Sequence, residues 1–211
     1  MSVRLTEPSG LMTLRSTETS PFGRKVRIAI DVLGLGARIA VAPANTLDEN
    51  DTLRQQNPLG KMPCLLLPGS EVLYDSGVII EYLQEFAGTD RLVPRQGPER
   101  YRKLTLATLA DGITDAALLM VYEGRFREPG AHSTRWLTHQ RGKMLRALAA
   151  FEPAPPPANV TDIVSIGLAC ALGYLDWRQP IAWRPEHPRL EQWLTDFSRH
   201  EGAFGRTQAK S

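Results

Sequence analysis

The sequence predicts two parts, an α/β domain to about residue 92 and an all-helical domain from about residue 100. Short alternating segments that are typical of strands occur only in the first part, where helical segments separate them. The second part contains helical patterns and no strand pattern. A hydrophobic content of 42% over 211 residues suits a globular protein with an ample core.

The first strand is predicted at residues 11–15. A helix then begins at Ser20-Pro21, because serine is a favoured N-cap and proline a favoured first helical residue. Gly34 supplies its end. The predicted buried face of this helix consists of Val26, Ala29, Ile30 and Leu33.

A second strand is predicted at residues 38–42, and the polar stretch 43–60 contains at most one short helix near Leu53. Residues 64–67 and 72–74 form a hairpin around Pro68-Gly69. The helix that follows places Val78, Ile79, Tyr82, Leu83 and Phe86 on one face. We expect a parallel pair of strands at the first crossover.

In the second part, helices are predicted at residues 100–126, 136–151, 161–177 and 189–199. The predicted organisation is a disordered extension at 1–10, the α/β domain at 11–92, a linker at 93–99 and the helical domain at 100–211.

Charge and composition exclude several classes of protein. The formal net charge is +2 with no block of like charge, so we predict neither a nucleic-acid partner nor a membrane surface. The polar N-terminus lacks a signal peptide, and no window approaches the ~20 apolar residues of a membrane span. Two distant cysteines, Cys64 and Cys170, favour a reducing cytoplasm. The four histidines match no zinc spacing, and we predict no metal.

Two helix starts carry hydroxyl groups, at Thr19-Ser20 and at Asp75-Ser76. A helix N-terminus favours anions, although capping alone would also explain both serines. Pro63 stands at the mouth of an apolar strand, where a proline cannot donate to a sheet ladder.

Three stretches in this order, SPFGRKVRIAIDVLG, NPLGKMPCLLL and YDSGVIIEYL, resemble the cytosolic glutathione transferases. NVTDIVSIGLACALGYLDW resembles the capping-box helix of their second domain, with Asn159 at the cap and Asp162 at the acidic position. The resemblance covers nearly all of the chain from Leu11. It implies a thioredoxin-like first domain, an all-α second domain and a serine-type member of a bacterial branch of the family.

The resemblance also implies a glutathione site. The peptide bond before Pro63 would be cis. Pro63 would give up one hydrogen bond of the sheet ladder at a sheet edge. Met62 would offer its backbone N–H and C=O to the cysteinyl part of glutathione. Asp75 and Ser76 would hold the γ-glutamyl end, and Lys61 the glycyl side. Ser20, or its neighbour Thr19, would donate a hydrogen bond to the sulfur.

Further implications concern the partner molecules. The small electrophilic substrate would contact Leu118, Val121, Tyr122 and Arg125. The biological role of the protein would be detoxification. Asp115 would reach across a homodimer to the glutathione ammonium group. The alternatives on the same scaffold are a glutathione-dependent disulfide reductase or dehalogenase, and a non-catalytic protein-interaction module.

Overall fold

The computed structural model describes residues 10–209, so the extension predicted at residues 1–10 lies, apart from Gly10, outside the described residues. The described chain forms two compact units. One comprises the residues up to Leu92 together with those from Thr207, and the other comprises Val93–Arg206.

A four-stranded sheet in the order β2-β1-β3-β4 forms the centre of the first unit. The strands are β1 (Met12–Arg15), β2 (Ile39–Ala42), β3 (Cys64–Leu66) and β4 (Val72–Tyr74). β1 and β2 are parallel, which confirms the predicted crossover, and β3 is antiparallel to both of its neighbours. The helices of this unit are α1 (Pro21–Val32), α2 (Leu53–Gln56) and α3 (Ser76–Phe86), with a 3-10 turn η1 at Gly36–Arg38.

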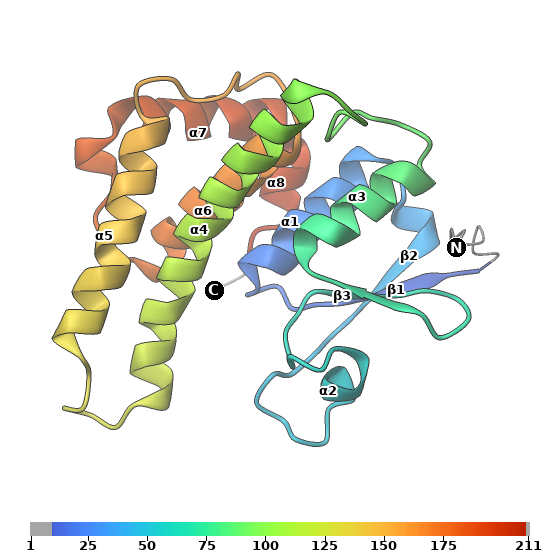
Figure 1. Cartoon of the computed structure of the whole chain (residues 1–211), viewed down its shortest axis with the longest axis horizontal. Coiled ribbons are helices and arrows are strands. Elements are labelled where there is room, and N and C mark those ends of the chain that lie inside the picture. The colour runs from blue at the N-terminus through green and yellow to red at the C-terminus, as the bar shows by residue number, and fades with distance from the viewer. Residues whose placement is uncertain (1–9, 210–211) are drawn as a thin grey trace. The chain divides into compact units, whose positions relative to one another are not determined.

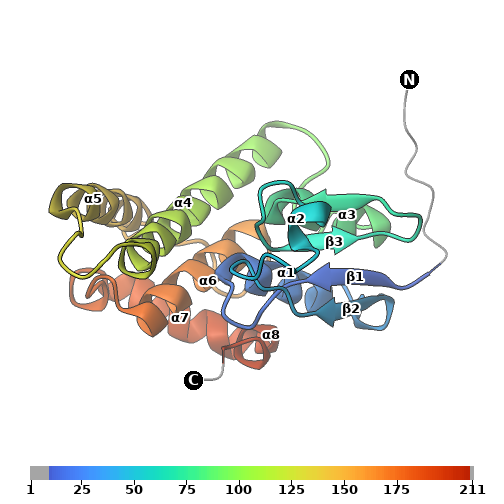
Figure 2. The ribbon, with the colours of Figure 1, turned by 90° about the horizontal axis from the view of Figure 1, so that it is seen from below.

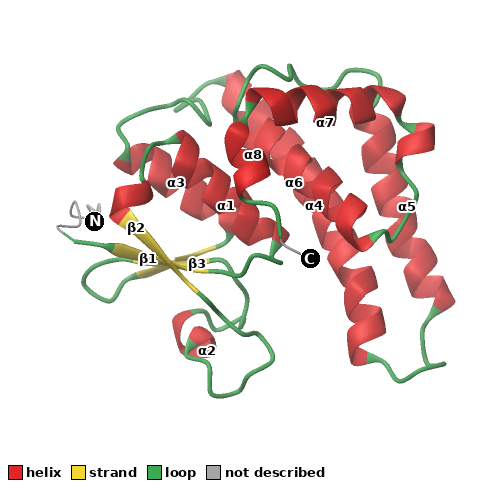
Figure 3. Ribbon diagram, turned by 180° about the vertical axis from the view of Figure 1, so that it is seen from behind, coloured by secondary structure: helices red, strands yellow, loops and turns green. Residues whose placement is uncertain are grey.

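Helices α1 and α3 lie on one face of this sheet and α2 on the other (Figures 1 and 3). Alternation along β1 sends Met12 and Leu14, both fully buried, to one face and Thr13 and Arg15 to the other. The predicted burial of Val78 is wrong, since its side chain is 51% exposed. The buried face of α3 is formed instead by Ile79, Ile80, Leu83 and Gln84.

The second unit is helical. Its helices are α4 (Pro98–Phe126), α5 (Thr134–Phe151), α6 (Ile163–Arg178), α7 (Pro188–His200) and α8 (Gly202–Arg206), with a 3-10 turn η2 at Arg184–Glu186. Helix α4 packs against both α5 and α6, and Figure 2 shows these three helices side by side. Most of α6 is buried, as its apolar sequence predicts.

The capping box of α6 differs from the prediction. The N-cap is Asp162, whose Oδ1 accepts hydrogen bonds from the backbone N–H groups of Val164 and Ser165 at 2.9 and 3.0 Å. The Ser165 hydroxyl lies 2.9 Å from the N–H of Asp162 and accepts its hydrogen bond. The box therefore starts three residues later than Asn159, because the helix begins at Ile163, and it places the acid at the cap and the serine inside the helix.

Helix α4 has the length and composition that a membrane span requires, with an 18-residue window of mean hydropathy 1.5. No such segment is predicted from the runs of apolar residues in the sequence. One helix of this kind is weak evidence for a membrane, because core helices of soluble proteins have the same composition.

Candidate functional site

The start of α1 holds the predicted sulfur contact. Ser20 is the N-cap, and its Oγ accepts a hydrogen bond from the N–H of Gly23 at 3.0 Å. Capping therefore uses a lone pair of this oxygen and leaves the hydroxyl hydrogen available for donation. The side chain of Thr19 is exposed and lies 3.1 Å from the Thr17 hydroxyl, oxygen to oxygen.

Thr17 was missed by the sequence analysis. Its hydroxyl lies 3.4 Å from the sulfur of Met62 and donates to it, so the β1–α1 loop contacts the residue before the proline. Gly23 permits this course of the loop, because a Cβ there would lie 1.9 Å from the Ser16 hydroxyl oxygen and 3.2 Å from the Ser20 Cβ. No motif marked Thr17, since the contact joins residues 45 positions apart.

The Met62–Pro63 peptide bond is cis, as the resemblance implied. The expectation that Pro63 gives up a ladder bond at a sheet edge is wrong. β3 is a central strand, and its pairing with β1 and β4 begins at Cys64. Pro63 therefore precedes the first ladder pair and removes no bond from the sheet.

The turn that leads to this bond is organised by Asn57, a second residue that sequence reasoning missed. Asn57 is 2% exposed, and its amide nitrogen donates to the carbonyl of Lys61 at 2.9 Å. The side-chain carbonyl oxygen of Asn57 accepts a hydrogen bond from the N–H of Leu59 at 3.0 Å. The Lys61 backbone is thus fixed by a buried amide, while its side chain is exposed.

Cys64, which follows the proline, is a buried thiol whose sulfur donates to the Lys61 carbonyl at 3.4 Å. Burial raises the pKa of this thiol to about 11, against a smaller opposing effect of the Arg15 charge. The thiolate is therefore scarce at neutral pH, and this cysteine is not suited to act as a nucleophile.

Arg15, at the end of β1, connects the strand to the segment before Asn57. Its guanidinium donates to Asp51 at 2.6 Å and to the Thr52 hydroxyl and the Gln56 side-chain carbonyl, each at 2.9 Å. It also donates to the Pro43 carbonyl at 3.1 Å. The backbone N–H groups of Asn45 and Leu53, and then Arg15, lower the pKa of Asp51. Together these bonds hold residues 43–56 against β1.

The start of α3 holds the predicted γ-glutamyl contacts. Asp75 is the N-cap at a φ of 74°, and its Oδ1 accepts from the N–H groups of Gly77 and Val78 at 2.8 and 3.2 Å. Both bonds use the same carboxylate oxygen, so Oδ2 remains available as an acceptor. Ser76 is the first residue of the helix and is 4% exposed.

The sheet register brings these three segments to one end of the sheet. Cys64 lies opposite Arg15 on β1 and opposite Tyr74 on β4. The chain therefore leaves the sheet at the same level at three points, which are Pro63, Ser16 and Asp75. These points adjoin the three predicted contact segments, namely Met62-Pro63, the β1–α1 loop and Asp75-Ser76.

The remaining predicted residues belong to α4 of the second unit. Asp115 and Arg125 are exposed, and Leu118, Val121 and Tyr122 are half-buried. The guanidinium of Arg125 lies over the ring of Tyr122, 5.4 Å from its centroid. Among residues 10–209, no group of three histidine, cysteine or carboxylate side chains is placed to hold a metal ion.

Comparison with known proteins assigns the family. Residues 14–91 match the model of the glutathione S-transferase N-terminal domain. The chain is 32% identical over 203 residues to an uncharacterized GST-like protein of Escherichia coli, YibF, covering 93% of this chain and 98% of that protein. The chain belongs to the glutathione transferase family.

Solved structures agree with this assignment. A glutathione transferase family member from Pseudomonas fluorescens Pf-5 with bound glutathione is 41% identical, with a TM-score of 0.89 over 95% of this chain and 100% of that one. A glutathione S-transferase from Methylobacillus flagellatus, also with glutathione bound, is 31% identical, with a TM-score of 0.85 over 94% and 100%. The thioredoxin-like sheet followed by a helical part is the fold of these proteins.

Proposed function

We propose that this protein binds glutathione through its first unit and transfers the glutathione thiolate to a small electrophile. The observation that carries the proposal is the convergence of the Ser20 loop, Met62-Pro63 and Asp75-Ser76 at one end of the sheet. The glutathione-bound relatives support the choice of ligand.

The two ends of glutathione differ in charge, and the start of α3 suits both charges of the γ-glutamyl end. Ser76 lies at the N-terminus of an 11-residue helix, where an anion such as the carboxylate is stabilised. The free Oδ2 of Asp75 suits the ammonium group. Met62 would pair with the cysteinyl backbone, and Lys61 would reach the glycyl carboxylate.

The chemical task of the site is to form the thiolate. A free thiol has a pKa near 8.5, and lowering it by about two units requires ~2.7 kcal/mol of differential stabilisation. The available hydroxyl hydrogen of Ser20, at the N-terminus of α1, can supply a charge-assisted hydrogen bond to the sulfur. Ser20 acts as a donor in this scheme and not as a nucleophile.

Calorimetry tests the binding step. Wild-type protein should bind glutathione in the micromolar to millimolar range, and Ser76→Ala should weaken binding because a buried hydroxyl contact is lost. No heat and no thermal shift at high glutathione would contradict the proposal and would favour a protein-interaction module instead.

The thiolate step has its own measurement. Thiolate absorbance of bound glutathione, titrated against pH, should show a lowered pKa in the wild type. Ser20→Ala should remove most of that shift, and Thr19→Ala, the matched control one residue away, should not. The reverse pattern would assign the donor to Thr19.

A panel of aromatic electrophiles, mixed disulfides and haloalkanes separates transfer to an aromatic ring from disulfide reduction and from dehalogenation of alkanes on the same scaffold. Conjugation of an aromatic electrophile at a higher kcat/KM than turnover of either alternative class is the expected result. We place this activity in the cytoplasm, in a detoxification role.

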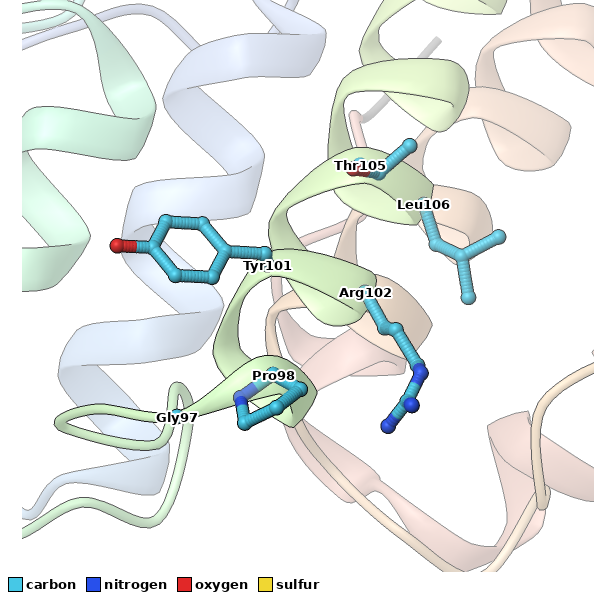
Figure 4. A pocket seen from close by; sticks show the side chains of 6 residues that line it. All are labelled: Gly97, Pro98, Tyr101, Arg102, Thr105 and Leu106. Carbon is cyan, nitrogen blue, oxygen red and sulfur yellow. The ribbon is translucent and has the colours of Figure 1, made fainter.

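We further propose a homodimer. The first turns of α4 carry a groove of about 810 Å³ lined by Gly97, Pro98, Tyr101, Arg102, Thr105 and Leu106. Figure 4 shows Tyr101 and Leu106 projecting from different sides of this helix, and their side chains are 68% and 40% exposed. Exposed apolar side chains around a groove favour a protein partner, and a second copy of the chain is the proposed occupant.

Asp115 completes this proposal as a contact to the glutathione ammonium group of the other subunit. Asp115→Asn should weaken glutathione binding by roughly tenfold, the effect of one charge-assisted contact, without changing dimerisation. Analytical ultracentrifugation and calorimetry on the same samples check both statements. A monomer that binds glutathione with wild-type affinity would overturn it.

A further inference from the structure

A cluster of aromatic and guanidinium side chains lies on α4 and α6 of the second unit. This arginine–aromatic cluster consists of Tyr122, Arg125 and Phe126 from α4 and Tyr174, Trp177 and Arg178 from α6. Only Tyr122 and Arg125 were predicted from the sequence, because the packing of α4 against α6, two helices distant in sequence, brings the two groups of side chains together.

The rings and the guanidinium groups contact one another in pairs. Tyr122 and Phe126 are in edge contact at 5.4 Å between centroids, and Tyr174 and Trp177 at 6.0 Å. The Arg178 guanidinium lies 3.6 Å from the centroid of the Trp177 ring. The cluster thus presents flat apolar surfaces with a cation beside each pair of rings.

The hydroxyl of Tyr174, on α6, lies within electrostatic range of groups on both helices. Burial, the largest effect, raises the pKa of Tyr174, and Arg178 opposes it by charge and by a hydrogen bond. Tyr122 and Arg125 of α4 also act on this hydroxyl electrostatically. Groups from both helices therefore act on one phenol, and the charges of the two guanidinium groups oppose the rise of its pKa.

Neither Arg125 nor Arg178 forms an ion pair with a carboxylate among residues 10–209. The nearest acids along the two helices are already engaged. Glu123 accepts from the N–H of Ser133 at 2.8 Å and from Arg127 at 3.4 Å. Asp176 pairs with Arg184 at 2.7 Å and accepts from the Trp183 indole at 2.9 Å.

The cluster is open to solvent at its rim. Arg125 and Phe126 are exposed, Phe126 by 63%, and Tyr122, Trp177 and Arg178 are half-buried. A planar ring can therefore stack against these side chains, and an anionic substituent on it can meet a guanidinium that no carboxylate of the described chain neutralises.

We propose that the arginine–aromatic cluster selects electrophiles that carry an aromatic ring and a negatively charged group such as a carboxylate. This inference rests on the proposed function for the reaction itself. In that reaction, with a chlorinated ring as the substrate, the glutathione thiolate forms a bond to the ring carbon that carries chlorine. The carbon–chlorine bond breaks, and its electron pair leaves with chloride.

Two matched chloroarenes test the selection. 4-Chloro-3-nitrobenzoate and 4-chloro-3-nitrobenzamide share ring, nitro group and leaving group and differ in charge. The wild type should convert the benzoate at the lower KM. Arg125→Gln and Arg178→Gln should each raise that KM roughly tenfold, the effect of one charge-assisted contact, and should leave the KM of the benzamide within about twofold. Arg141→Gln, an exposed arginine on α5, controls for the change in net charge.

A binding measurement without glutathione separates this inference from the proposed function. Titration with the unreactive 3-nitrobenzoate and 3-nitrobenzamide, followed by calorimetry, should show tighter binding of the benzoate, lost in both arginine variants. If this pattern appears without any conjugation, the proposed function fails and the anion selectivity of the cluster stands. Equal affinity for the two probes, or an equal loss of both in the variants, would overturn the inference even in an active transferase.

Discussion

The proposed glutathione site and the arginine–aromatic cluster are built in different ways. In the first unit, hydrogen bonds between near neighbours in sequence shape each segment of the site, between Ser20 and Gly23, between Asp75 and Gly77 and between Asn57 and Lys61. In the second unit, the pairs of rings form within α4 and within α6, and the packing of α4 against α6 brings the two pairs together. Local hydrogen bonds fix the shape of each segment of the first site, whereas the two halves of the second come together only through the register of whole helices.

Disruption of the α6 capping box should separate the two sites most clearly. Asp162 is 6% exposed, caps α6 and pairs with Lys103 of α4 at 2.7 Å. Asp162→Ala removes both interactions, and we expect the free energy of unfolding of the helical unit to fall by about 2–3 kcal/mol, more than a lost cap alone costs. Urea unfolding followed by tryptophan fluorescence measures this, because all four tryptophans lie in the helical unit.

The same variant should lose affinity for 3-nitrobenzoate while the folded fraction keeps its glutathione affinity. Asp162→Asn is the control, since an asparagine still caps the helix and only the ion pair is lost. An equal loss of both ligands in Asp162→Ala would remove the distinction between the two sites.

The reverse separation is expected from Arg15. Arg15→Met removes the bonds that hold residues 43–56 to β1, and these residues lead directly to the Asn57 turn and Met62. We expect roughly threefold to tenfold weaker glutathione binding, the range of one or two lost hydrogen bonds at a distance from the ligand. Calorimetry should find 3-nitrobenzoate binding unchanged, and Arg54→Met, an exposed arginine of α2, should have no effect on either ligand. Wild-type glutathione affinity in Arg15→Met would show that the segment does not need this anchor.

A buried polar residue offers a way to stabilise the helical unit without touching either site. Gln140 on α5 is fully buried, and neither its amide nitrogen nor its carbonyl oxygen has a hydrogen-bond partner among the described residues. Gln140→Met keeps the length of the side chain and removes both polar groups, so we expect the free energy of unfolding to rise by about 1 kcal/mol. Thermal unfolding checks this, and Gln140→Glu, which buries a charge at the same position, should lower the midpoint. A lower midpoint in Gln140→Met would indicate that the amide is bonded in solution.

The smallest effect is expected from the thiol beside the proposed site. Because burial raises the pKa of Cys64 to about 11 from a usual value of 9.0, the folded protein keeps this proton when the unfolded chain loses it. Its contribution to stability is therefore complete below pH 9 and is lost as the pH rises from 9 to 11. Cys64→Ala should flatten the decline of the urea midpoint in that window and leave glutathione conjugation at neutral pH intact. Inactivation of the variant would contradict the conclusion that Cys64 takes no part in the reaction.

The sequence by itself determined the features that short-range chemistry encodes. Ser20-Pro21 defined the start of α1, Gly34 its end, and Pro68-Gly69 the hairpin, because caps and turns depend on a few neighbouring backbone angles. The order of motifs then identified the family, and with it the segments around Met62 and Ser76.

Only the tertiary structure decided where distant residues meet. It put β3 in the centre of the sheet, so that Pro63 costs no ladder bond, and it paired Asp162, the cap of α6, with Lys103 of α4. It also joined Thr17 to Met62 and brought Tyr122 and Arg125 of α4 close enough to act electrostatically on Tyr174 of α6. The physical reason is that side-chain packing between elements depends on their relative register, which no local pattern of residues specifies.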